Sequence, residues 1–359
     1  MANGDVLNAS RLGLKHGGAA NDLFLKVFAN EILTTFDEKN VMKDLHTIRT
    51  IQSGKSAQFP VTGIATAKYH VVGEDVLESD AAYSSSIKHS ERVINIDDVL
   101  LAATFIANID EMKNHYDVRS IYAKELGKAL AKRFDIATMK TLFAAAGTSD
   151  VLGNDVPDGT SLDISDGDCA GFSTASNIIS TITTCAQKLD ENDIPEDDRF
   201  IILTPANYYK LVSANSDAVS FTTSTGGVTG AGYSRLENPL LSTGQVSLAD
   251  AKVAQVAGIN VIKSNHLADV IAEGNASSTA TGDGASSNDV NAGAGVGYNA
   301  NFTGLEGLAG HKSAIGTVKL MDLTTESEYI MTKQGTALVA KYAMGHGVLR
   351  PEAAIKIVA

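Results

Sequence analysis

The stretch Ile121-Tyr-Ala-Lys-Glu-Leu-Gly-Lys-Ala-Leu-Ala-Lys-Arg-Phe-Asp-Ile-Ala137 carries the clearest structural signal in the chain. Its apolar side chains recur every three or four residues, at Tyr122, Leu126, Leu130, Phe134 and Ala137. This spacing places them on one face of an α-helix. The pattern predicts a helix of about 30 residues within 109–146, roughly 45 Å long at 1.5 Å per residue. A helix of this length is well above average and suits a structural spine.

The first residues are predicted to form an arm. Residues 1–20 are small, polar and rich in glycine, which is typical of a mobile chain end. An apolar series follows at Phe24, Phe28, Ile32 and Phe36, and its spacing of four predicts a helix with one apolar stripe. Such a stripe must be covered. In a compact domain it is core, and on an arm it must dock on a neighbouring molecule.

Residues 55–98 read as a long two-stranded loop that reaches away from the body. Phe59 and Val61 belong to the outgoing strand, which Pro60 restricts to the edge of a sheet. A polar tip over 73–86 precedes a return strand over 87–96. An isolated hairpin of this kind is only marginally stable in water, so we expect it to need partner surface.

The rest of the chain mixes helical and strand patterns, which indicates an α+β fold. Helices are predicted over 172–190 and 206–214. Continuous apolar runs over 198–203 and 257–262 are typical of buried strands. Further strands are predicted over 314–320, 328–331, 337–342 and 354–358. Small and polar residues dominate 147–170 and 273–307, which are predicted to be loops.

Composition restricts the class of protein. The chain has 359 residues, 44% of them apolar, and a formal net charge of −13. That charge argues against tight binding to nucleic acid, which needs clustered Lys and Arg. No apolar run approaches the roughly 20 residues that span a bilayer, and the first residues lack the regions of a signal peptide. We therefore expect folding in the cytosol, a reducing compartment in which Cys169 and Cys185 stay free thiols.

The motifs do not predict an enzyme. Gly54-Lys-Ser56 matches the end of a phosphate-binding loop, but Arg49 stands where that motif needs its first glycine. His346 lies between Gly345 and Gly347 without a base partner at a suitable spacing, so we interpret it as packed or hydrogen-bonded. The histidines and cysteines lack the spacing of a zinc site. We predict no catalytic residue, no metal site and no cofactor.

Segments near both ends of the chain resemble one known family. They are Leu23–Phe28, Ile51–Pro60, Asn114–Ser120, His311–Leu320 and Lys341–Ala354. Together they resemble the major capsid protein of T-seven-like short-tailed bacteriophages, podoviruses of the autographivirus type. The resemblance is dense over 21–146 and 308–356 and weaker between them.

The resemblance implies the Hong Kong 97-type phage capsid fold. Residues 1–54 would form its N-terminal arm and 55–98 its extended loop. Residues 99–175 together with 308–359 would form the peripheral domain, which includes the spine helix. Residues 176–307 would form the axial domain.

The resemblance also implies a structural function. The protein would assemble with itself into hexamers and pentamers of an icosahedral head, around a scaffolding protein and with a portal protein at one vertex. Packaged double-stranded DNA would be a neighbour only by non-specific proximity. The protein would be assembled in the bacterial cytoplasm and reside in the virion capsid, without contact to a membrane. Two alternatives stay open, an encapsulin-type compartment shell protein and a cytosolic enzyme with an unrecognised site.

The arm and the loop supply the candidate contacts between subunits, because such thin elements cannot bury their own apolar faces. The candidates are Phe24, Phe28, Ile32 and Phe36 on the arm, and Phe59, Val61, Tyr69 and Val71 on the loop.

Overall fold

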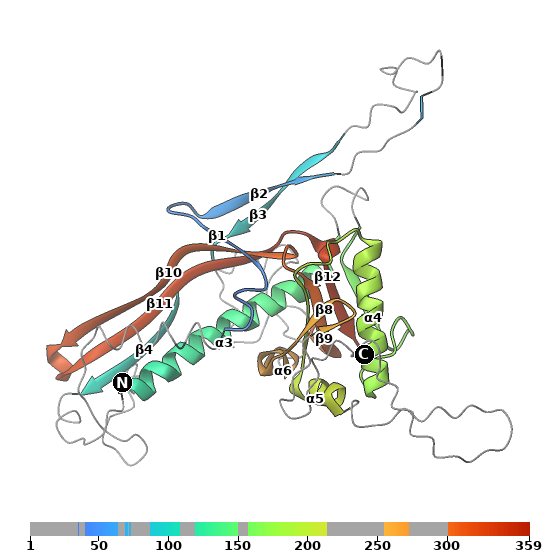
Figure 1. Ribbon diagram of the computed structural model, residues 1–359. Coiled ribbons are helices and arrows are strands. Elements are labelled where there is room, and N and C mark those ends of the chain that lie inside the picture. The colour runs from blue at the N-terminus through green and yellow to red at the C-terminus, as the bar shows by residue number, and fades with distance from the viewer. Residues whose placement is uncertain are drawn as a thin grey trace, which may run out of the picture.

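Two larger sheets pack against one long helix in the computed structural model, and a third sheet of two strands lies apart from it (Figure 1). The structure describes Thr35 and residues 40–63, 69–70, 72, 87–107, 119–149, 157–213, 255–272 and 301–359. A long two-stranded ribbon runs beside the helix, shorter strands and helices gather at its far end, and a hairpin projects away from both (Figure 1).

Helix α3 (Arg119–Ala145) is the axis of the molecule. Its 27 residues span roughly 40 Å at 1.5 Å per residue, which confirms the predicted helix from residue 119 on. Residues 109–118 lie outside the described part of the chain. From Ile121 to Ala129 one face of the helix is exposed, whereas almost all side chains after Leu130 are buried except Lys132. The second half of the helix therefore lies between the two larger sheets.

The first sheet has four strands and lies along α3. In spatial order they are β1 (Thr47–Thr50), β10 (Ile315–Ile330), β11 (Gly335–Val348) and β4 (Leu100–Ala107). The short helix η2 (Met331–Lys333) closes the β10–β11 hairpin. The Phe134 ring of α3 packs edge-on against Tyr342 and His346 of β11, with centroids 6.5 and 5.1 Å apart. This contact places the C-terminal strand β11 against the long helix.

The second sheet has six strands at the far end of α3. In spatial order they are β5 (Thr160–Asp163), β12 (Ala354–Val358), β9 (Leu305–His311), β6 (Arg199–Leu203), β8 (Ile259–Lys263) and β7 (Gln255–Val256). Every residue of β6 is buried, which confirms the strand predicted over 198–203. The short helix η3 (Pro351–Ala353) precedes β12.

Three helices accompany the six-stranded sheet. They are α4 (Ala175–Glu191), α5 (Pro205–Ser213) and α6 (Asn265–Ala272). The Thr174 side chain caps α4 by accepting a hydrogen bond from the Asn177 amide, and Ile178, Ile182 and Leu189 are fully buried. Helices α4 and α5 confirm the helices predicted over 172–190 and 206–214 within three residues at each end. Helix α6 was not predicted.

Several sequence predictions were wrong in extent. The strands predicted over 314–320 and 328–331 are parts of the single strand β10, whose register shifts near Met321. Strand β5 lies inside the predicted loop 147–170, and β9 begins inside the predicted loop 273–307. Strand β4 was not predicted. Strands β5 and β9 are rich in Gly, Ala, Ser or Thr, which composition alone does not distinguish from a loop, whereas β4 is an apolar run.

The six-stranded sheet joins both predicted domains. Strands β6, β7 and β8 come from the range assigned to the axial domain, whereas β5, β12 and most of β9 come from the peripheral range. Strand β9 hydrogen-bonds to β6 on one side and to β12 on the other. The boundary between the two ranges therefore runs through a continuous sheet.

A substitution at Phe302 tests whether the end of the predicted loop 273–307 belongs to the hydrophobic core. The Phe302 side chain has no exposure, and its ring packs edge-on against Phe143 of α3 with centroids 5.0 Å apart. We expect Phe302→Ala to lower the free energy of unfolding by about 3–5 kcal/mol, because it removes a buried ring and leaves a cavity. Urea unfolding of the soluble subunit measures this, and Phe302→Leu should retain most of the stability. A loss below about 0.5 kcal/mol, as expected for a surface loop, would contradict the assignment.

Candidate assembly surfaces

The projecting hairpin is built from two strands that pair with no third strand among the described residues. Strand β2 (Ser56–Thr62) pairs antiparallel with β3 (His89–Asn95), from Ser56 opposite Asn95 to Thr62 opposite His89. This confirms the two-stranded loop predicted within 55–98. Both strands are edges, so the missing N–H group of Pro60, opposite Glu91, interrupts no central ladder. Figure 1 shows the hairpin leaving the body above the four-stranded sheet.

Glycines on β10 and β11 form the seat on which the base of the hairpin lies. Ile94 of β3 is 1% exposed and packs over Gly316 and Gly347, which are register partners. A Cβ atom at Gly347 would lie 2.6 Å from Ile94 Cγ1, and one at Gly345 would lie 1.9 Å from the Asn95 carbonyl oxygen. The Asp97 amide donates to the Met344 carbonyl at 3.3 Å. The strands can approach this closely only because these positions lack side chains.

A small apolar cluster and one arginine hold the outgoing strand. Ala57, Ile94 and Val318 form the buried centre of the cluster, and Phe59 packs at its margin. The Arg49 guanidinium lies 5.4 Å from the Phe59 ring centroid, and its Nη1 donates to the Gln58 carbonyl at 3.1 Å. Such a cation–π contact stabilises by about 0.5–1 kcal/mol at an exposed site. The base of the hairpin is therefore fixed in direction by its own chain.

Two apolar residues that the structure describes beyond the paired strands have no such cover. Tyr69 is 97% exposed and Val72 is 98% exposed. Val93, on the face of the hairpin opposite Ile94, is 46% exposed. Large apolar side chains presented on a projecting element are typical of an interaction surface. The hairpin therefore combines a fixed base with exposed apolar side chains at Tyr69 and Val72.

The eight predicted contact residues fall into two groups. Phe59 and Val61 are half-buried on the same face of β2 as Ala57, and Tyr69 is exposed. The other five lie outside the described residues; they are Phe24, Phe28, Ile32, Phe36 and Val71. That any of the eight contacts a second subunit stays a prediction.

Sequence reasoning missed further exposed apolar residues. Val99 and Leu101 are 52% and 56% exposed at the start of β4, and Ile121 is 56% exposed near the start of α3. Tyr329 and Met331 are 46% and 75% exposed at the closed end of the β10–β11 hairpin. The apolar run from Val99 to Ala107 was the available signal for β4, and its odd-numbered residues point outward at the start.

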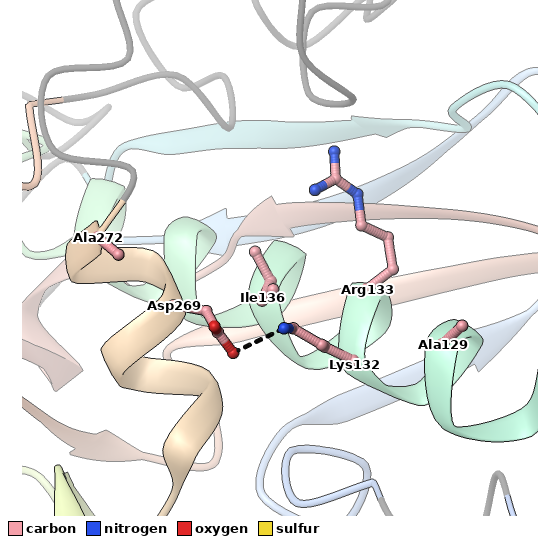
Figure 2. A pocket seen from close by; sticks show the side chains of 6 residues that line it. All are labelled: Ala129, Lys132, Arg133, Ile136, Asp269 and Ala272. Carbon is pink, nitrogen blue, oxygen red and sulfur yellow. Dashed lines mark ion pairs between the residues drawn. The ribbon is translucent and has the colours of Figure 1, made fainter. Parts of the chain in front are cut away.

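A shallow groove separates α3 from α6. It has a volume of about 420 Å³ and is lined by Ala129, Lys132, Arg133, Ile136, Asp269 and Ala272. Figure 2 shows Lys132 of α3 reaching across to Asp269 of α6, with Nζ and Oδ2 3.0 Å apart. The two atoms form an ion pair without the alignment of a good hydrogen bond. The charged groups bridge the walls rather than converge on a ligand, so the groove is not a candidate active site.

The motifs weighed for chemistry have structural roles. Gly54, with φ of +118°, lies in an exposed bend before β2. His346 is 4% exposed, and its Nδ1 lies 2.8 Å from Thr317 Oγ1, which confirms its interpretation as packed and hydrogen-bonded. Cys169 and Cys185 are buried free thiols, and burial raises the pKa of Cys185 to about 12. Within the described ranges, no group of three or more His, Cys, Asp or Glu could hold a metal ion, and no helix could span a membrane.

Comparisons with known proteins identify the family. The sequence model of the family described as "Gp10A-like: Major capsid protein" matches residues 58–358. The chain belongs to this family of major capsid proteins. It is 33% identical to the major capsid protein of Enterobacteria phage T3 over 94% of this chain and 91% of that protein. It is 32% identical to the major capsid protein of Escherichia phage T7 over 96% of this chain and 94% of that protein.

The structure of a capsid relative agrees with the fold described above. The capsid structure of the cyanophage P-SCSP1u matches with a TM-score of 0.68 and 35% identity over 89% of this chain and 88% of that chain. This match confirms the predicted Hong Kong 97-type α+β capsid fold. The protein is thus a T7-like major capsid protein that assembles with itself into the virion capsid. The family is structural and not enzymatic, and neither alternative function is favoured.

The glycine seat gives a direct test of how the hairpin is held. We expect Gly345→Ala to displace the hairpin base, because the new methyl group would overlap the Asn95 carbonyl, and overpacking of this kind costs about 1–3 kcal/mol. The melting temperature of assembled particles and the rate of proteolytic cleavage within the hairpin report the displacement.

Gly147→Ala is the matched control, because the nearest contact of its new methyl group would be the flexible end of Lys356 at 3.1 Å, and the Ala144 carbonyl oxygen would lie at an ordinary 3.7 Å. If Gly345→Ala particles melted and were cleaved like Gly147→Ala particles, the seat would not fix the hairpin.

Proposed function

We propose that this major capsid protein forms the hexamers and pentamers of an icosahedral head that encloses double-stranded DNA. Assembly proceeds around a scaffolding protein, and a portal protein occupies one vertex. The observation that carries the proposal is the hairpin, whose base is fixed on Gly345 and Gly347 while Tyr69 and Val72 are almost fully exposed. An element of this form is complete only when a second subunit covers its end.

The proposed mechanism of assembly is adhesion through many weak contacts. Each square ångström of apolar surface buried between subunits contributes about 25 cal/mol, and ordering and association oppose this gain. Each contact alone is then weak enough to break, which allows misplaced subunits to leave during assembly. Several contacts per subunit, made at once, stabilise the closed shell far more than any one of them.

The proposal assigns parts of the chain to roles in the shell. Residues 1–54 act as the arm and 55–98 as the extended loop. The peripheral domain comprises 99–175 and 308–359, and the axial domain 176–307. The continuity of the six-stranded sheet across the last boundary favours movement of the two domains as one body. The contact residues are Phe24, Phe28, Ile32 and Phe36 on the arm and Phe59, Val61, Tyr69 and Val71 on the loop.

The acidic charge of the chain supports a loose relation to packaged DNA. A net charge of −13 does not favour the release of counterions that drives tight binding to the phosphate backbone. Walls of this sign allow DNA to slide past them. The proposal therefore includes DNA as cargo and not as a specifically bound ligand.

Electron microscopy tests the proposal as a whole. The full chain is expressed with a scaffolding protein from a T7-like phage and purified by sedimentation. We expect closed icosahedral shells with capsomers of five and six subunits. A solitary subunit under these conditions, or particles without such capsomers, would contradict the proposal.

The arm is tested by Phe28→Asp, which places a charge in its apolar stripe. We expect a soluble subunit but at least a tenfold loss of particles in a complementation assay, because burying an unpaired carboxylate against a neighbour is costly. Asn30→Asp adds the same charge outside the stripe and should leave particle yield unchanged. Normal yield from Phe28→Asp would exclude the arm from the contacts.

The loop is tested by comparing two aromatic residues. Tyr69→Ala should leave urea unfolding of the subunit unchanged, since Tyr69 is 97% exposed, but should lower the melting temperature of assembled particles. A well-packed aromatic anchor at an interface contributes about 2 kcal/mol or more. Phe59→Ala should instead affect the subunit itself, because Phe59 packs in the cluster under the hairpin. Particles of Tyr69→Ala that melt like the wild type would argue against the loop contact.

A further inference from the structure

One buried residue fastens the segment that precedes β1. The Met42 side chain has no exposure. Its amide donates to Asp135 Oδ1 of α3 at 3.0 Å, and the Val41 amide donates to Asp135 Oδ2 at 2.9 Å. The Met42 carbonyl accepts from His46 Nδ1 at 2.6 Å. The chain before residue 40 is therefore joined to the body through a residue whose amide and carbonyl groups are both hydrogen-bonded.

Three hydrogen-bonded side chains lead from Met42 into the four-stranded sheet. His46 Nε2 lies 2.7 Å from Thr317 Oγ1 of β10, which lies 2.8 Å from His346 Nδ1 of β11. All three residues are at most 4% exposed. The Phe134 ring of α3 packs against both imidazoles, with centroids 5.7 Å from His46 and 5.1 Å from His346. These three side chains are thus enclosed by the core of the protein.

The hydrogen bonds fix the proton positions. The Met42 carbonyl can only accept, so His46 Nδ1 carries a hydrogen and Nε2 of the neutral ring accepts from the Thr317 hydroxyl. The Thr317 oxygen then accepts from Nδ1 of His346. A second proton on His46 would turn Nε2 into a donor, so the Thr317 hydroxyl would lose this acceptor and His346 would have to take its other tautomer to supply a new one. The arrangement with both rings neutral needs no such rearrangement.

The electrostatic surroundings favour the neutral rings. Burial lowers the pKa of His46 to about 4, and the positive charge of Lys312 acts in the same direction. The Met42 carbonyl, Asp135 and Asp44 act to raise this pKa but do not offset the burial. Burial also lowers the pKa of His346 to about 3, and the electrostatic effect of His46 acts in the same direction. The Asp135 carboxylate is shared with two backbone amides and with His266 Nδ1 of α6, 2.8 Å away. It is therefore not a dedicated partner for a charged His46.

The three hydrogen-bonded residues differ in how firmly their backbone is held in the sheet. Thr317 and His346 face each other within the long β10–β11 ladder. His46 instead directly precedes β1, a strand of four residues at the sheet edge that pairs only with β10. Moving His46 into water breaks its hydrogen bonds to Met42 and Thr317 and so releases residues 40–46, but it leaves the β10–β11 pairing intact. A charge on His46 is therefore relieved most readily by displacement of this segment.

We propose that residues 40–46 are an acid-released anchor that holds the N-terminal part of the chain to the body while His46 is neutral. Protonation of His46 frees the segment before the sheets unfold. A released His46 takes up a proton near pH 6.5, whereas the buried ring does so only near pH 4, so falling pH favours release and the anchor is intact above pH 6.5. The anchor lies where the N-terminal arm leaves the body of its own subunit. The proposal therefore does not depend on which surface of a neighbouring subunit the arm contacts.

Hydrogen exchange on assembled wild-type particles tests the anchor. Protection factors, which correct for the pH dependence of intrinsic exchange, are compared at pH 7.5 and pH 5.0. The difference between the two His46 pKa values predicts that protection of residues 40–46 falls about thirtyfold, while a peptide from β9 changes little. A change below about threefold, or an equal change in both peptides, would overturn the proposal.

Two glutamine variants assign the response to one histidine. His46→Gln keeps a side chain that can donate and accept but cannot be protonated, so residues 40–46 should show the same protection at both pH values. His89→Gln, which replaces an exposed histidine on β3, should retain the full thirtyfold response. A thirtyfold response that persists in His46→Gln would overturn the assignment. Failure of the anchor would leave particle yields from Phe28→Asp unaffected, so the two proposals fail separately.

Discussion

The burial of one helix between two sheets is the interaction on which the rest of the structure depends. The second half of α3 has few exposed side chains, because Phe134 packs under β11 while Phe143 packs against Phe302 beside β9. Both sheets share this helix, so their relative positions are set by its length and by the order of its side chains. The seat of the hairpin lies on the same strand, β11, that Phe134 contacts. The direction of the hairpin is therefore a consequence of the helix packing.

The function of the protein follows from what this arrangement leaves uncovered. The body has a continuous core, yet Tyr69 and Val72 on the hairpin and Met331 at the tip of the long ribbon lie outside it. In a monomeric protein such residues would reduce solubility without a benefit. In a major capsid protein, which assembles with copies of itself, we propose that they contact those copies. The function of the protein thus depends on the shape of its surface, and that shape determines which partner surface fits.

The sequence predicted the parts of the fold whose patterns are local. The apolar repeat of α3, the buried run of β6 and the hairpin around Pro60 were recognisable because each pattern reflects its own element. Strand β9 was not recognisable, because Gly307 and Gly310 make it look like a loop. Both glycines are required by neighbours that approach closely, Phe172 and Leu203 at the first and the Ala353 carbonyl at the second. That requirement exists only in the folded protein.

The assembly surfaces were predictable only in outline. The hairpin was expected to need a partner, and Tyr69 is indeed exposed, but Phe59 is half-buried in a cluster with Ile94 that joins distant parts of the chain. Contacts of this kind depend on which segments meet in space. The hydrogen-bonded chain from His46 to His346 has the same origin, since 300 residues of sequence separate its ends.

The most direct test of the account is a high-resolution electron microscopy map of the assembled particle. The account predicts that Tyr69 and Val72 lose most of their exposure to a neighbouring copy, while Ile94 stays on the glycine seat of its own subunit. A map in which the end of the hairpin remains surrounded by solvent, or folds back onto its own body, would contradict it.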